Sequence, residues 1–214
     1  MDWTAFADFG TAIGTLVLAF ATFAATRSAN RSARLAEKAL LEGLRPLLLP
    51  SNFGDETQKV RFQDGRWLVV KGGRASMQIN AASVALVMSV RNVGSGLAVL
   101  HGWSIPKDPQ EAPADPAAFR RLTRDIYVST QYVGFVQVAI RDPESEAYRT
   151  VVERARSEDF VLVDVLYGDA EGTQRVISRF SVSKGPAEHP SDDGEEYFVT
   201  VSRHWNIDLP SPRG

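Results

Sequence analysis

The stretch FGTAIGTLVLAFATFAAT, residues 9–26, decides how the rest of the chain is organised. It contains no charged residue, no proline and no cysteine. An apolar run of about 18 residues is long enough for an α-helix to cross the hydrocarbon core of a bilayer. A cleaved signal peptide has bases before this run, but here the charged side chains before it are those of Asp2 and Asp8. We therefore expect residues 1–26 to form an uncleaved transmembrane anchor.

Small residues within this run allow two further interpretations. Glycines and threonines dilute its hydrophobicity, as in a buried helix of a soluble protein. Helices that are apolar on all sides are unusual in a domain of this size, so the anchor is favoured. Gly10 and Gly14 are four residues apart, a spacing that lets two membrane helices approach closely. The sequence therefore predicts a helix-pairing surface at these two glycines.

A basic cluster directly follows the apolar run, and no base precedes it. Its members are Arg27, Arg31, Arg34 and Lys38. Lysine and arginine are retained on the cytoplasmic side of a membrane, so we expect the N-terminus outside and the C-terminal domain in the cytoplasm. The same cluster is expected to face anionic lipid headgroups. A specific lipid or protein site is the alternative for these four residues.

Residues 27–44, RSANRSARLAEKALLEGL, are predicted to continue the helix as a stalk beyond the membrane. They contain no proline and many good helix formers, and Pro46 ends the pattern. Ala29, Ala33, Ala36 and Leu40 follow a 4-3-4 spacing, which is typical of a seam between paired helices. Two interpretations remain open: the stalk pairs with that of a second copy, or it packs on its own domain.

Composition changes after Pro46, where Val, Ile, Phe, Tyr and Thr become frequent and turn signals recur. Residues 45–207 are therefore predicted to form an antiparallel β-sandwich of immunoglobulin-like architecture, with a small barrel as the alternative. Short helices are expected at 117–122 and 143–156, and a disordered tail at 208–214. We expect strands at 47–49, 59–62, 66–71, 83–91, 97–105, 127–140, 160–167, 175–182 and 197–205.

Turn residues and alternation add detail to this prediction. Gln63-Asp64-Gly65 and the loop 168–172 each predict a hairpin, and the turn 92–96 is expected to pair the strands on either side of it. Two inward-facing sets are predicted from the period of two. They are Val84, Leu86, Met88 and Val90 in one strand, and Tyr197, Val199, Val201 and Trp205 in another.

No constellation of residues points to a particular chemistry. The absence of cysteine excludes disulfides, thiolate zinc sites and cysteine nucleophiles, and the net charge of -2 gives no support for nucleic-acid binding. His101, His189 and His204 lack metal-ligand spacing, and no G-x-S-x-G elbow is present. Asp169 and Glu171 are too few oxygens for calcium and suit a solvated turn. We therefore predict no catalytic, cofactor-binding or metal site.

Large aromatic residues are expected in the core or on a sheet face. They are Trp67, Trp103, Trp205, Phe135 and Tyr132.

Four short motifs carry a family resemblance. They are R-S-x-x-R-x-A-R-L-A-E-K-A at 27–39, RPLLLP at 45–50, RNVGSGLAV at 91–99 and VLYGDAEGT at 165–173. In this order, over about residues 13–180, the chain resembles uncharacterised bacterial single-pass membrane-anchored β-sandwich proteins of the actinobacterial type. The resemblance implies an architecture and a bacterial inner-membrane location, and it brings no known activity, substrate or catalytic residue.

The function expected from these features is non-enzymatic. We predict a membrane-tethered interaction or scaffold module that binds another protein or itself, with a subunit of a larger membrane complex as one version. The alternative is a small-molecule sensor whose β-sandwich binds a ligand and signals through the stalk, and an enzyme ranks third. Expected partners are the lipid bilayer, a second copy through the helix and an unidentified protein, with no cofactor and no nucleic acid.

Overall fold

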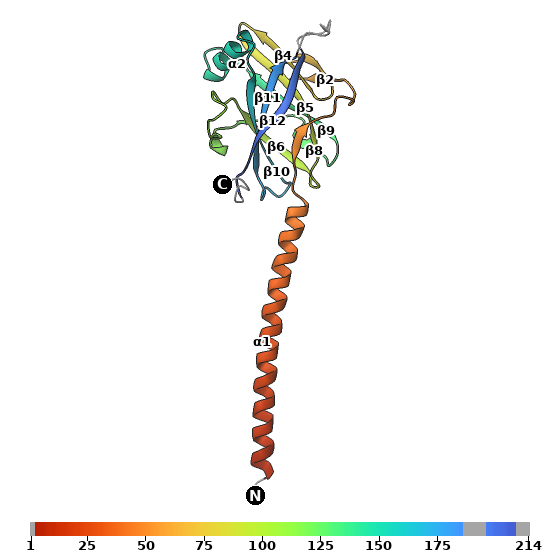
Figure 1. Ribbon diagram of the computed structural model, residues 1–214, viewed down its shortest axis with the longest axis vertical. Coiled ribbons are helices and arrows are strands. Elements are labelled where there is room, and N and C mark those ends of the chain that lie inside the picture. The colour runs from red at the N-terminus through yellow and green to blue at the C-terminus, as the bar shows by residue number, and fades with distance from the viewer. Residues whose placement is uncertain (1–2, 186–195, 209–214) are drawn as a thin grey trace. The chain divides into compact units, whose positions relative to one another are not determined.

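The structure is a computed structural model that describes residues 3–185 and 196–208. It divides into two compact units, residues 1–43 and residues 44–214, which we describe separately. The first consists of helix α1 and the second is a β domain (Figure 1). The prediction of a mainly β protein with an N-terminal apolar helix is confirmed.

Helix α1 is continuous over Trp3–Gly43, 41 residues, and so is about 60 Å long. Its apolar part contains no proline. Some of its threonines donate hydrogen bonds from their hydroxyl groups to backbone carbonyls four residues earlier. Thr15 donates to the carbonyl of Thr11 at 2.8 Å and Thr22 to that of Leu18 at 2.7 Å. An 18-residue window within Gly10–Gly43 has a mean hydropathy of 1.4 and no buried residue. By length and composition, this helix can span a membrane.

The strands of the β domain pair in the antiparallel sense throughout the described residues. Among the described residues the large sheet has the order β1-β5-β4-β12-β11-β10-β6-β7, with β9 paired to β5 and β8 to β6. The strands are β1 (Leu48–Pro50), β2 (Gln58–Arg61), β3 (Trp67–Val70), β4 (Arg74–Asn80), β5 (Ser83–Asn92), β6 (Ala98–Ser104), β7 (Arg120–Arg121), β8 (Tyr127–Val128), β9 (Val133–Ile140), β10 (Val161–Gly168), β11 (Val176–Lys184) and β12 (Glu196–Asn206).

The main core collects buried side chains from β5 and β9 and from β10 and β11, strands that all belong to the large sheet, so the sheet folds over on itself in a sandwich-like arrangement. The predicted inward set on β5 is confirmed, because Val84, Leu86, Met88 and Val90 are all fully buried in this core. They meet Val163, Val165 and Phe180 from the opposite layer. Burial of such side chains contributes roughly 1.5–3 kcal/mol each, before the conformational entropy that opposes folding.

A third layer covers the outer face of β5. The hairpin β2–β3 places Val60, Phe62, Leu68 and Val70 against Ala85 and Val87, and all six are buried. The hairpin itself was predicted, and Gly65 in its turn has a φ of 85°, which a residue with a side chain rarely adopts. Burial on both faces explains the unbroken apolar run from Val84 to Met88 in β5.

The predicted pairing of β5 with the following strand is wrong. β6 pairs with β10, β7 and β8 instead. Asn92 directs this crossover, because its side-chain amide donates to the carbonyls of Gly96 at 2.7 Å and Val128 at 3.0 Å. Gly96 packs so closely on the start of the domain that an added Cβ would lie 1.6 Å from the Leu44 carbonyl oxygen. Residues 92–96 are therefore a link between layers rather than a hairpin turn.

Two other strand predictions need correction. The region 127–140 is divided into β8 and β9 by a turn in which Gln131 has a φ of 64°, and Tyr132 is 70% exposed. Strand β4 was not predicted, although its sequence RASMQIN alternates between polar and apolar residues along its whole length.

The predicted inward face of β12 holds for only part of the strand. Tyr197, Val199 and Val201 face the main core, whereas Trp205 packs with Phe119 and Ile177 on the opposite face. The register explains the change: Arg179 pairs with Arg203 but the next residue, Phe180, pairs with Val201. Ser202 is thus an extra residue, and a one-residue bulge reverses every later side chain.

Both short helices are present. A 3-10 turn, η1 (Pro116–Ala118), is capped by Asp115, and α2 (Glu146–Arg156) begins after Ser145, whose hydroxyl accepts from the Tyr148 N–H. Asp208, which the sequence analysis placed in a disordered tail, forms an ion pair of 2.7 Å with Arg175. Residues 209–214 of that tail, and His189, lie outside the described residues.

Candidate functional site

The predicted pairing surface on α1 is sterically open. A Cβ added at Gly10 or Gly14 meets no atom within 4 Å. Large apolar side chains around it are also exposed, among them Leu16, Phe20 and Phe23. Helix pairing at the two glycines stays a prediction.

The basic cluster Arg27, Arg31, Arg34 and Lys38 forms one stripe along α1. Its 4-3-4 spacing puts the four side chains on the same face, and they line a shallow groove together with Phe23 and Leu35. Within the described part of the chain, no ion pair joins any of them to a carboxylate. The stripe directly follows the apolar stretch on one unbroken helix, and its role toward lipid stays a prediction.

A second basic site, which the sequence analysis missed, lies in the β domain. We call it the arginine cavity: it is a hollow of about 230 Å³ between the hairpin β2–β3, the segment after η1 and the end of β9. Phe62, Trp103 and Ala139 supply apolar wall, and Gln63, Thr123 and Gln137 supply polar groups. Its charged lining residues are Arg120, Arg121, Arg124 and Arg141.

Contacts position three of these arginines around the cavity. The Arg120 guanidinium lies 5.4 Å from the centre of the Trp103 ring. Arg141 donates to the side-chain oxygen of Gln63 at 3.4 Å, and Arg124 donates to the Arg61 carbonyl at 3.3 Å. Among described residues, no carboxylate lines the cavity. The signal that could have located it is the run RRLTR at 120–124, although Arg141 is brought in only by the fold.

The nearest acids are already engaged. Asp64 accepts two bonds from Arg66, at 2.9 and 2.6 Å, and these bonds lower the pKa of its carboxyl group. Asp125 accepts a bond of 2.8 Å from the largely buried Gln137. The positive charge of the cavity is therefore not balanced by a carboxylate within it.

A buried ion pair on the other side of the domain has a structural role. Asp164 on β10 and Arg179 on β11 pair across the strands, and both side chains are 1% exposed. Two parallel bonds of 2.7 Å join the guanidinium to the carboxylate. Burial raises the pKa of Asp164, and the bonds from Arg179 oppose that rise.

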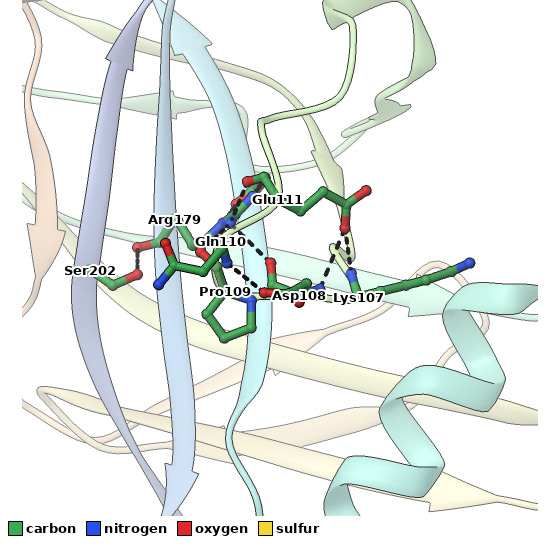
Figure 2. A network of polar contacts seen from close by, with 8 residues as sticks. Lys107, Asp108, Pro109, Gln110, Glu111, Arg179 and Ser202 are labelled. Atoms are coloured by element: carbon green, nitrogen blue, oxygen red, sulfur yellow. Dashed lines mark hydrogen bonds and ion pairs between the residues drawn. The ribbon is translucent and has the colours of Figure 1, made fainter. Parts of the chain in front are cut away.

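The same arginine fastens the loop between β6 and η1. Its Nη1 donates to the carbonyls of Asp108, Pro109 and Glu111 at 3.3, 3.0 and 2.9 Å (Figure 2). The Glu111 carboxylate closes the loop by accepting from the Lys107 N–H at 3.0 Å. All three guanidinium nitrogens of Arg179 thus donate to groups inside the protein, which identifies a structural role for this residue.

Both described histidines are partly buried. His204 lies in a polar chain in which its Nδ1 is 3.1 Å from the Ser178 hydroxyl, which in turn is 3.0 Å from the Tyr167 hydroxyl. Burial lowers the pKa of His204, and the charge of Arg45 adds to this effect. His101 also has a pKa lowered by burial, and its Nε2 is buried without a hydrogen-bond partner. No group of three His, Asp or Glu side chains that could hold a metal occurs among the described residues.

The Asp169 carboxylate is hydrogen-bonded within its own loop and holds that loop in place. It accepts bonds from the Thr173 and Gln174 N–H groups at 2.7 and 3.0 Å. Of the large aromatics, Trp103 is buried in the main core, whereas Trp67 lies on strand β3 and is 59% exposed.

Comparisons with protein-family models, with curated proteins and with solved structures find no match to this chain.

Proposed function

We propose that this chain is a bacterial single-pass inner-membrane protein that acts by binding rather than by catalysis. Helix α1 is its anchor, with the N-terminus outside and the β domain in the cytoplasm. The β domain binds a protein partner, as a scaffold or as a subunit of a larger membrane complex. The helix also brings two copies together through the surface at Gly10 and Gly14.

One observation carries this proposal. The apolar surface of α1 is exposed on all sides, with Leu16, Val17, Leu18 and Phe20 each more than half exposed. Such a surface is unfavourable in water, where monomeric soluble proteins rarely expose contiguous apolar patches of this kind. Lipid removes the penalty, and the positive stripe that follows supports the orientation through the retention of bases on the cytoplasmic side.

Fractionation and topology experiments test the proposal directly. The full chain should sediment with membranes and be released by detergent but not by high salt or carbonate. A cytoplasm-active reporter fused after Gly214 should be active, and an external protease should leave the β domain intact in spheroplasts. Recovery of the full chain in the soluble fraction without detergent contradicts the anchor, and digestion from outside contradicts the orientation.

Partner binding needs a separate experiment. Site-specific crosslinkers in the β domain should trap the same protein in living cells from several adjacent positions. The trapped protein should then bind the purified full chain in detergent at micromolar concentration or tighter. Failure of direct binding contradicts the interaction role while leaving the membrane anchor untouched.

A further inference from the structure

The arginine cavity gathers positive charge, and no carboxylate in its described lining balances that charge. Outside the lining, the pKa of Asp64 is lowered by the bonds from Arg66 and also by the charge of Arg141. Like charges held close together destabilise the folded state, because each guanidinium remains charged at any physiological pH. The chain as a whole has a net charge of -2, so this concentration is local and does not reflect a basic protein. A carboxylate in the cavity wall would relieve the repulsion, and the described wall has none.

Donor groups in the cavity are largely unused. An arginine has five N–H donors, and its planar fork suits two oxygens of a carboxylate or phosphate. The bonds that Arg141 and Arg124 make within the protein are long, at 3.4 and 3.3 Å, and each involves one nitrogen. The Trp103 ring under Arg120 and the Gln63 side chain beside Arg141 hold these groups in place before any ligand arrives.

Size limits what can enter. At about 230 Å³ the cavity is smaller than the pockets of roughly 300–1,000 Å³ that hold drug-sized ligands. We propose that it binds a small oxyanion with two or more negative charges on phosphate or carboxylate oxygens. Arg120, Arg124 and Arg141 donate to the anion. Gln63 donates to the Thr123 hydroxyl and accepts from Arg141, so its role is to position its neighbours, while the Thr123 hydroxyl keeps its own hydrogen for the anion. This site is independent of the membrane anchor and of any protein partner.

Calorimetry on the full chain in non-ionic detergent tests the site, with pyrophosphate and citrate as probes at constant ionic strength. The test variant is R120Q/R141Q, and the matched control is R149Q/R156Q, which removes two exposed arginines from α2 and changes the net charge equally. We expect wild type and control to bind with dissociation constants within about twofold of each other. The test variant should bind at least about tenfold more weakly, since bonds to charged groups are removed.

The two probes distinguish the chemical sources of the anion. Binding of pyrophosphate alone assigns a phosphate ligand, binding of citrate alone assigns a carboxylate ligand, and each supports the site. The unliganded test variant should melt no lower than wild type, because neutral side chains relieve the repulsion. If R120Q/R141Q melts lower than wild type, the binding test uses the single variant R124Q, which keeps the Trp103 and Gln63 contacts. R124Q should weaken binding at least about threefold. Absence of binding by wild type, or equal weakening in the control, overturns the proposal.

Discussion

Replacing Arg179 with methionine should destabilise the β domain strongly, and by an amount that depends on pH. Methionine fills much of the same volume but leaves Asp164 buried without a counter-charge and three loop carbonyls without their donor. Removing one partner of a buried ion pair typically costs about 3–5 kcal/mol. We expect a loss of this size at pH 7.

The pH dependence follows from the remaining carboxylate. Burial already raises the pKa of Asp164, and without Arg179 nothing opposes the rise. A raised pKa in the folded state means that stability present at low pH is lost as pH rises through that pKa. The relevant pH range lies between the Asp164 pKa of the folded wild type and that of the folded variant. Within it, the loss of unfolding free energy in R179M should grow by about 1.4 kcal/mol per pH unit. The variant should accordingly be rescued by acid, because a protonated Asp164 needs no counter-charge.

Urea unfolding of the full chain in detergent, followed by tryptophan fluorescence at pH 5, 6 and 7, measures this deficit. The Arg179 guanidinium lies 5.0 Å from the Trp205 ring, so the signal reports on the site. The double variant D164L/R179M should recover part of the loss, since an apolar pair carries no buried charge. Arg175→Met, which breaks the partly exposed pair with Asp208, serves as control and should cost less than about 1 kcal/mol. An R179M deficit that is equal at pH 5 and pH 7 would refute the reasoning.

Three further predictions concern other parts of the chain. Phe62→Ala should cost about 3–5 kcal/mol in urea unfolding because it opens the layer under the hairpin, whereas Tyr127→Ala, at an exposed position, should cost less than about 1 kcal/mol. Burial lowers the pKa of His204, so the unfolded chain binds more protons than the folded protein, and stability should fall as pH drops below about 6.5. His204→Gln should make this decline of stability with pH shallower. An unchanged slope contradicts the assignment to His204. G10L/G14L should reduce the amount of crosslinked dimer in membranes at least about threefold. Ala12→Leu, on the opposite face of the helix, should not reduce it. Equal reductions in the two variants argue against a pairing surface at the glycines.

Sequence patterns were sufficient where one physical signal dominated. The long apolar run predicted helix α1, and apolar residues at every second position of β5 identified its core face, because burial on that face leaves little choice of residue. The turn chemistry of Gly65 likewise located the β2–β3 hairpin. These features depend on neighbours in the chain, which a sequence displays directly.

Long-range features were not accessible in this way. The pairing of β6 with β10 depends on the Asn92 side chain bonding across to Val128, and nothing local indicates that bond. A single extra residue at Ser202 reversed the face of Trp205, and alternation alone cannot reveal such a bulge. The arginine cavity was missed for the same reason, since Arg141 lies 17 residues beyond Arg124 and joins it only through the fold.

The contrast between Arg179 and the cavity arginines is the strongest physical argument for a ligand. Both kinds of site sit in one domain and use one residue type. Arg179 bonds its carboxylate twice and three carbonyls besides, as a structural arginine should when burial makes each unmade bond costly. Arg124 and Arg141 make one long bond each and face an open hollow. The cavity arginines are solvent-exposed, so water can satisfy their donors, but several positive charges on one cavity wall also repel one another. An anion in the cavity would offset that repulsion and would use the free donors, and this supports the proposed binding site.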